Sequence, residues 1–151
     1  MTDPHVLYVV ANRSGALMYE ESKKKKFKFV RRLLNLKGRR MERELVTDRP
    51  GRGRVADGLQ SHHAYDKATA ERQHVAETFA ARIAHLLQRS WNEKEFDSLV
   101  IAAEPHFLGM LKTQLARCTP NVPTHVIAKE FRQISDRDMS RRLHEELRRT
   151  G

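Results

Sequence analysis

The chain has 151 residues, a single cysteine and a formal net charge of +10 at pH 7. A chain of this length forms one domain whose core needs no disulfide, and one cysteine excludes an intrachain disulfide. No run approaches the roughly 18 apolar residues of a membrane span, and the first residues do not read as a secretion signal. We therefore expect a cytoplasmic protein without a membrane partner.

The first third of the chain has the pattern of three antiparallel strands. Residues 5–11 (HVLYVVA) form a short apolar run rich in β-branched and aromatic residues, and the turn residues 12–15 separate it from a second run at 16–21. A run of lysines precedes the third segment, 27–36, in which Phe27 and Phe29 alternate with Lys28. We expect these two phenylalanines to pack in the strand.

Residues 37–69 show little hydrophobic periodicity and contain four glycines and many charges. We therefore predict a long basic loop there, irregular or mobile around 49–63. After it, Val75, Phe79, Ile83 and Leu87 recur at helical spacing and predict an amphipathic helix over 70–91.

The last third alternates strands and helices. Residues 98–103 and 124–129 predict short buried strands, Pro105 begins a helix, and Ser135 or Asp136 can cap a final one. The fold class is α/β in a single domain, 1–151, with a mixed sheet of about five strands flanked by three helices. We expect the following residues to be buried: Val75, Phe79, Ile83, Leu99, Val100, Ile101, Leu108, Leu111, Val126 and Leu143.

The excess of positive over negative charge is confined to one segment. Residues 23–54 hold 14 Lys and Arg against three acids, whereas the other positions hold 15 basic and 16 acidic side chains. Such a run is either a solvated face or a surface for a polyanion, and we expect RNA or the ribosome as partner. The candidate binding residues are Lys23, Lys24, Lys25, Lys26, Arg39, Arg40, Arg49, Arg52 and Arg54.

Residue patterns that carry catalytic or cofactor chemistry are absent from the sequence. The eight histidines lack metal-binding spacing, and no phosphate-binding glycine motif occurs, so we expect neither a metal nor a cofactor. Cys118 has no nucleophile signature and is interpreted as a packing residue. Glu104 and His106 follow a predicted parallel strand, where open α/β sheets place their sites, but a turn acid and a helix-cap histidine are the commoner explanation.

Three segments carry a family resemblance: VVANRSGALMYE (9–20), ELVTDRPGR (44–52) and LVIAAEPHFLGMLKTQL (99–115). Together they resemble the bacterial host attachment protein family over nearly the whole chain. Their order and spacing are also similar to the middle domain of archaeal and eukaryotic class-1 peptide release factors, where a hairpin precedes a loop carrying Gly-Gly-Gln and then a long helix. The resemblance implies the same fold.

The resemblance also implies a motif loop, although its sequence departs from the release-factor pattern. Residues 57–60 read Asp-Gly-Leu-Gln where Gly-Gly-Gln is expected, so Gln60 follows a bulky leucine and the motif is not intact. We expect no peptidyl-tRNA hydrolysis and no catalytic residue. The remnants of the motif loop are Asp48, Pro50, Gly51, Gly58 and Gln60.

Three functions from different classes remain open at this point. The first is a non-enzymatic RNA-binding or ribosome-associated module, for which host attachment is an indirect phenotype. The second is an interaction protein directly involved in host-cell attachment, and the third is a hydrolase that retains release-factor chemistry. The protein partner and the oligomeric state do not follow from the sequence.

Overall fold

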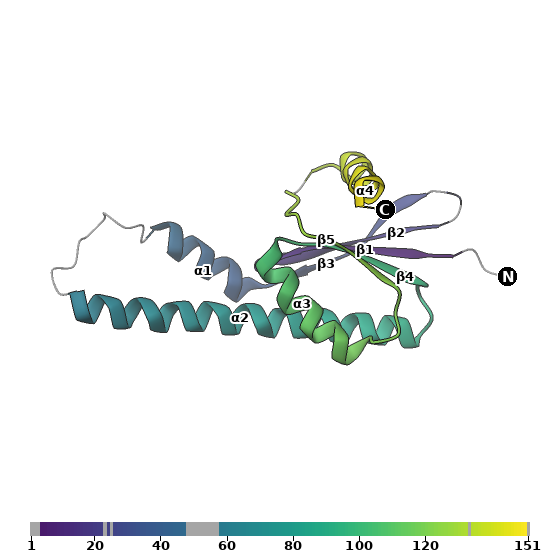
Figure 1. Ribbon diagram of the computed structural model, residues 1–151. Coiled ribbons are helices and arrows are strands. Elements are labelled where there is room, and N and C mark those ends of the chain that lie inside the picture. The colour runs from purple at the N-terminus through teal and green to yellow at the C-terminus, as the bar shows by residue number, and fades with distance from the viewer. Residues whose placement is uncertain (1–3, 23, 25, 48–57, 133, 151) are drawn as a thin grey trace.

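Five strands form one mixed sheet with the order β3-β2-β1-β4-β5 (Figure 1). The structure is a computed structural model, which describes residues 4–22, 24, 26–47, 58–132 and 134–150. Antiparallel pairs join β1 (Val6–Asn12) to β2 (Gly15–Glu21) and β2 to β3 (Phe27–Leu34). Parallel pairs join β1 to β4 (Ser98–Ala102) and β4 to β5 (Thr124–Ile127). The predicted fold class is confirmed, including the antiparallel front half.

Helices cover both faces of this sheet. α2 (Gly58–Asn92) and α3 (Pro105–Cys118) pack on one face, and α4 (Asp136–Thr150) packs on the other (Figure 1). α1 (Leu36–Thr47) runs beside the first half of α2, and the two project together beyond the sheet. The described residues thus contain four helices rather than the three that we predicted.

Two apolar cores lie on opposite faces of the sheet. The α2–α3 core joins Val9 and Ile101 of the sheet to Phe79, Ile83 and Leu111 of the helices. These side chains are almost completely excluded from solvent, because the central strands are covered on both faces.

The α4 core is smaller, and aromatic rings make up a larger share of it. It joins Tyr8, Tyr19 and Ile127 to Met139 and Leu143 of α4. Of the ten residues predicted to be buried, nine are buried, and Val126 is half-buried at the edge of the α2–α3 core.

The turn between β1 and β2 is fastened to the start of α1. The side-chain amide of Asn35, itself buried, donates to the Arg13 carbonyl at 2.9 Å, and the Asn35 backbone N–H donates to the Ser14 carbonyl at 2.9 Å. Gly38 lies so close that a Cβ there would collide with the Arg13 carbonyl oxygen. The missing side chain of Gly38 therefore allows α1 to dock on the turn.

The caps of the last two helices agree with the sequence. Glu104 precedes Pro105, and its carboxylate accepts hydrogen bonds from the backbone N–H groups of His106 and Phe107 at 3.0 and 2.6 Å. Ser135 precedes α4, and its hydroxyl accepts from the N–H of Asp138 at 3.2 Å. Both side chains satisfy N–H groups that a helix start leaves without an internal partner.

The predicted loop over 37–69 is wrong for most of its length. Residues 36–47 and 58–69 are helical, so Arg39 and Arg40 lie on a helix, and α2 begins 12 residues before the predicted start at 70. The expected irregularity at 49–63 is likewise wrong for 58–63, and 48–57 lie outside the described residues. Weak hydrophobic periodicity favours a loop, but a projecting helix that buries few side chains also lacks this periodicity. The many Arg, Glu, Leu and Ala residues of these segments favour helix.

The expectation that both strand phenylalanines pack is also wrong in part. Phe27 is half-buried and stacks on Tyr19, with ring centroids 4.8 Å apart, but Phe29 is 44% exposed. The reason is topological, because β3 is an edge strand whose outer part no helix of the described residues covers, and alternation alone does not tell an edge strand from a central one.

Candidate functional site

Exposed Lys and Arg side chains follow β3 and α1. We define the β3–α1 basic surface by nine side chains, all of them exposed: Lys24, Lys26, Lys28, Arg31, Arg32, Lys37, Arg39, Arg40 and Arg43. Only two acids, Glu42 and Glu44, lie among the described residues of the same stretch. Apart from Arg43, the nine make no salt bridge with a carboxylate of the described residues.

The strand geometry distributes these charges over both faces of the sheet edge. Arg31 pairs with Met18 of the α2–α3 core, whereas Arg32 pairs with Leu17, which packs against the α4 core. Successive side chains of a strand point to opposite faces, so these neighbours face opposite sides. Charged side chains along an exposed edge also oppose pairing with another strand.

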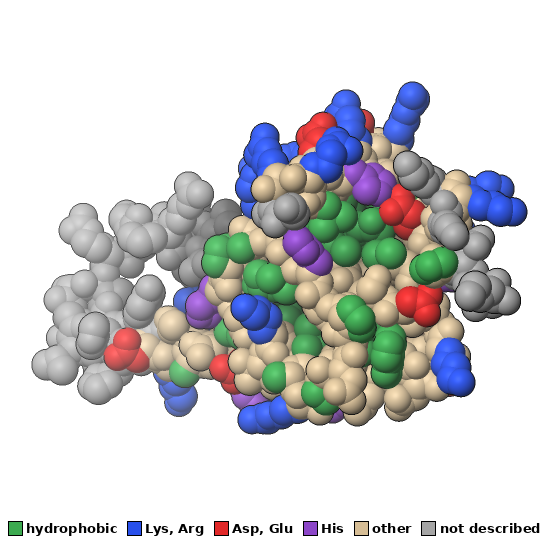
Figure 2. Space-filling model, turned by 45° about the vertical axis from the view of Figure 1, so that its right-hand side comes forward, with side chains coloured by type: hydrophobic (Ala, Val, Ile, Leu, Met, Phe, Trp, Pro, Cys, Tyr) green, Lys and Arg blue, Asp and Glu red, His purple; other side chains and the backbone are tan. Residues whose placement is uncertain are grey.

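The arginines of α4 present a different electrostatic environment. Arg141 lies 3.3 Å from Asp138, and Glu146 accepts ion pairs from Lys129 at 2.8 Å and Arg149 at 3.5 Å. The cations beside Glu146, Lys129 first, lower the pKa of its carboxyl. Figure 2 shows the result along the top of the molecule, where α4 lies, as Lys and Arg side chains with acids between them. The charge of α4 is therefore largely compensated.

The described structure reaches only some of the predicted binding residues. Lys24 and Lys26 lie in the connection between β2 and β3, and Arg39 and Arg40 are the fourth and fifth residues of α1. Gly58 and Gln60 lie in the first turn of α2. The remaining predicted residues lie outside the described residues: Lys23, Lys25, Asp48, Arg49, Pro50, Gly51, Arg52 and Arg54.

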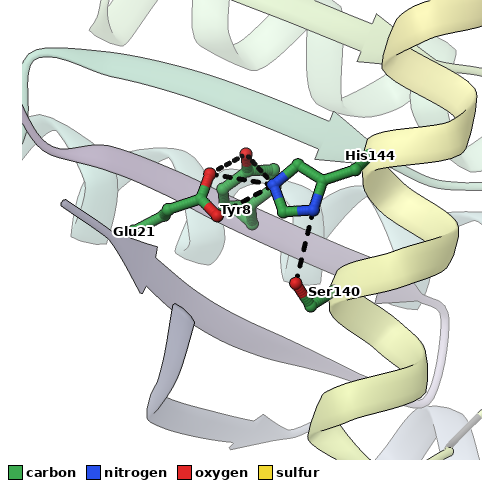
Figure 3. A network of polar contacts seen from close by, with 4 residues as sticks. All are labelled: Tyr8, Glu21, Ser140 and His144. Carbon is green, nitrogen blue, oxygen red and sulfur yellow. Dashed lines mark hydrogen bonds and ion pairs between the residues drawn. The ribbon is translucent and has the colours of Figure 1, made fainter. Parts of the chain in front are cut away.

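A polar network that the sequence did not reveal joins α4 to the sheet (Figure 3). The Tyr8 hydroxyl donates to Glu21 Oε1 at 2.8 Å, and His144 Nε2 lies 2.8 Å from Glu21 Oε2. The Ser140 hydroxyl lies 3.3 Å from His144 Nδ1. Burial, and then the hydrogen bond to Glu21, raise the pKa of Tyr8 well above its ordinary value.

This serine, histidine and carboxylate do not form a nucleophilic triad. Ser140 lies inside a continuous helix, so the backbone N–H that follows it is used within the helix and does not point at an oxyanion. We interpret the network as a hydrogen-bonded fastening of α4. No spacing in the sequence brings Tyr8, Glu21 and His144 together, because their proximity depends on the docking of α4.

Glu104 and His106 lie at the carboxyl end of β4, beside the end of β1. The guanidinium of Arg13 contacts His106 Nδ1 at 2.6 Å, and Glu104 is occupied as the cap of α3. Both side chains thus have structural partners. Cys118 is half-buried against the α2–α3 core, in agreement with its interpretation as a packing residue.

A comparison with known families shows to which protein family the chain belongs. The family model described as "Protein required for attachment to host cells" matches residues 7–143. The chain belongs to this host attachment family. No curated protein matches it significantly.

The host attachment match extends from β1 into α4. It contains every residue of the β3–α1 basic surface as well as Tyr8 and Glu21, and it ends one residue before His144. No described helix of this family member is both long and apolar enough to cross a membrane. Within the described ranges, no group of three His, Cys, Asp or Glu side chains is placed to hold a metal ion.

Proposed function

We propose that this host attachment protein is a non-enzymatic RNA-binding module that acts with the ribosome, and that attachment depends on it indirectly. The observation that carries the proposal is the β3–α1 basic surface, with nine exposed cations and two acids over one strand and one helix. A phosphate backbone is the partner that matches a row of exposed cations with few acids among them. The family description records a phenotype, which a cytoplasmic effect on translation would also produce.

The order of sequence segments that resembles release factors is our reason for the ribosomal part of this proposal. The chain has a β-hairpin followed by a basic segment and a long helix, the order found in the release-factor middle domain. Residues 57–60 nevertheless lack the intact Gly-Gly-Gln sequence. We therefore propose binding to the ribosome or its RNA without ester hydrolysis.

Counterion release sets the expected salt dependence of this binding. If about four to six side chains neutralise phosphates, log affinity falls with log salt with a slope of about −3 to −4 for single-stranded RNA. Sequence preference from such contacts is weak, because phosphates are the same at every position. Removal of three of the contacting lysines reduces the slope by about 2.

The test compares two triple variants that lose the same charge. The first, Lys24→Gln, Lys26→Gln and Lys28→Gln, removes cations from the β3–α1 basic surface. The second, Arg137→Gln, Arg141→Gln and Arg148→Gln, removes three exposed cations from α4, of which Arg141 is paired with Asp138. Three positions in each set keep the net charge of the two variants equal.

Binding to RNA is measured by fluorescence anisotropy at several salt concentrations, and association with ribosomes by sedimentation with and without RNase. We expect the lysine variant to lose affinity and salt slope, and the α4 variant to keep most of both. Equal losses in the two variants would show that only bulk charge matters. A wild-type protein that remains at the top of the gradient in growth and stress conditions would contradict the ribosomal association.

One observation favours a second function, direct participation in attachment through a protein partner. Phe29, Val30 and Leu36 are 44, 46 and 69% exposed on or beside the edge strand β3. Exposed apolar side chains of this kind mark protein contacts when they gather at one place. Phe29→Ser with Val30→Ser separates the two functions, since a loss of attachment with unchanged RNA affinity would favour the protein partner.

A further inference from the structure

A cavity of about 210 Å³ lies on the α4 side of the sheet, beside the turn between β1 and β2. Its lining includes Asn12, Ser14, Leu17, Arg32, Arg39 and Phe131, and no residue of α4. α4 packs over Tyr8 and Tyr19 and leaves this corner of the sheet open. The cavity therefore occupies the part of the sheet face that the helix does not cover.

The charge in this cavity is positive. Arg32 and Arg39 are its two charged side chains, one from β3 and one from α1, and no acid of the described residues lines it. Arg39 and Ser14 also border a wider hollow of about 810 Å³ over α1, where Arg40 and Arg43 lie. A polyanion on the β3–α1 basic surface would thus pass the mouth of the cavity.

The rest of the lining suits a flat, partly apolar group with hydrogen-bonding edges. Leu17 and Phe131 supply apolar surface. Asn12 Oδ1 accepts from the backbone N–H groups of Ser14 and Gly15 at 2.8 and 3.1 Å, so its amide nitrogen is the end that remains to donate to a ligand. The volume is below that of sites for whole drug-sized ligands, which indicates a single ring system rather than several.

We propose that this cavity binds one nucleoside monophosphate unit, as an unpaired nucleotide of a bound RNA. The base lies against Leu17 and Phe131 and accepts from the Asn12 amide, and its phosphate contacts Arg32 and Arg39. The inference rests on the proposed RNA-binding function and adds to it a preference for unpaired over base-paired RNA. An inorganic phosphate would use the two arginines but not the apolar floor.

The chain offers a matched pair of double variants. Arg32→Gln with Arg39→Gln removes both cations of the cavity. Arg31→Gln with Arg40→Gln removes the same charge from the adjacent positions, since Arg31 faces the opposite side of the sheet and neither side chain lines the cavity. All four side chains are exposed, so both proteins are expected to fold.

Each full-length protein is titrated with a single-stranded RNA, with the same sequence as a blunt duplex, and with AMP, CMP, GMP, UMP and inorganic phosphate. Methyl NMR signals of Leu17 report on the cavity floor. We expect mononucleotides to shift them in the wild type and in the Arg31/Arg40 variant, but not in the Arg32/Arg39 variant. Because the Arg32/Arg39 variant can no longer hold the unpaired nucleotide in the cavity, its single-strand affinity should fall about tenfold further than that of the Arg31/Arg40 variant, whereas duplex affinity should fall equally in both.

The outcomes separate this inference from the proposed function. If the two variants lost single-strand affinity equally while the wild type still bound RNA, nucleotide binding in the cavity would be refuted. The proposed RNA-binding function would remain. If inorganic phosphate shifted the Leu17 methyl signals as much as mononucleotides do, the cavity would be only an anion site, and the inference would also be refuted. If mononucleotides shifted the Leu17 methyl signals but the protein bound no RNA, the proposed RNA-binding function would be refuted and the ligand would be a free nucleotide.

Discussion

The replacement of Gly38 by alanine tests how α1 is held. A Cβ at this position collides with the Arg13 carbonyl oxygen and lies 2.6 Å from the side-chain nitrogen of Asn35. α1 must therefore move away from the turn, because the Arg13 carbonyl belongs to the backbone, and this movement disturbs the hydrogen bond from Asn35 to Arg13. Overpacking costs about 1–3 kcal/mol, and an unsatisfied buried amide costs about 1–3 kcal/mol.

Alanine offsets part of this loss, because it favours helix over glycine by about 1 kcal/mol. We therefore expect Gly38→Ala to lower the free energy of unfolding by roughly 1–3 kcal/mol. For a chain of this length, that corresponds to a decrease in Tm of about 2–12 °C. The assay is urea denaturation followed by far-UV circular dichroism, with Tm measured in parallel.

Gly109→Ala is the matched control within the same molecule. Gly109 also lies inside a helix, α3, but it is exposed and a Cβ there meets no atom within 4 Å. This variant should gain about 0.5–1 kcal/mol, because only the helix preference changes. If both alanine variants were more stable than the wild type, the close contact between α1 and the β1–β2 turn would be incorrect.

Three further predictions concern other parts of the molecule. Burial raises the pKa of Tyr8 and of Tyr19 above 10.0, so their contribution to stability is complete below about pH 10 and is lost as the pH rises through the higher folded-state values. Absorbance at 295 nm should show these two tyrosines ionising only together with alkaline unfolding; ionisation in the folded protein would contradict their burial. Ile83→Ala should cost about 2–5 kcal/mol in urea denaturation, because Ile83 is 0% exposed, whereas Leu36→Ala at a 69% exposed position should cost far less, and similar losses would contradict the assigned core. Release of labelled peptide from peptidyl-tRNA on ribosomes should be at background for the wild type and for Gln60→Ala, and release that depends on Gln60 would overturn the proposal of a non-enzymatic function.

The fold could be predicted where burial imposes a pattern on the sequence. The apolar runs of β1 and β4, the helical spacing from Val75 to Leu87, and the caps at Pro105 and Ser135 all reflect packing or backbone hydrogen bonding, and all appear in the structure. α1 was missed for the opposite reason. Most of its surface is exposed, and its glycine at position 38 reads as a breaker although it serves a close contact.

The candidate site was predictable only as a charge excess along the chain. The count of cations along the chain pointed to this segment. The structure shows in addition that Arg31 and Arg32 face opposite sides of β3, which follows from the strand register. The cavity beside Asn12 and Phe131 could not be foreseen, because these residues are distant in sequence and meet only when the sheet and the segment after β5 are folded. The polar network around Glu21 depends on the docking of α4 in the same way.

The length of α2 separates the part of the molecule that maintains the fold from a part that is free to change. A helix of 35 residues is about 50 Å long, and from Asp66 onward its first buried side chain is that of Val75. From Asp66 to His74 every side chain is exposed except that of Arg72, which is half-buried. Substitutions at these exposed positions should therefore cost little stability. The binding properties of the projecting α1–α2 pair could change during evolution while the sheet and its two cores stay constant.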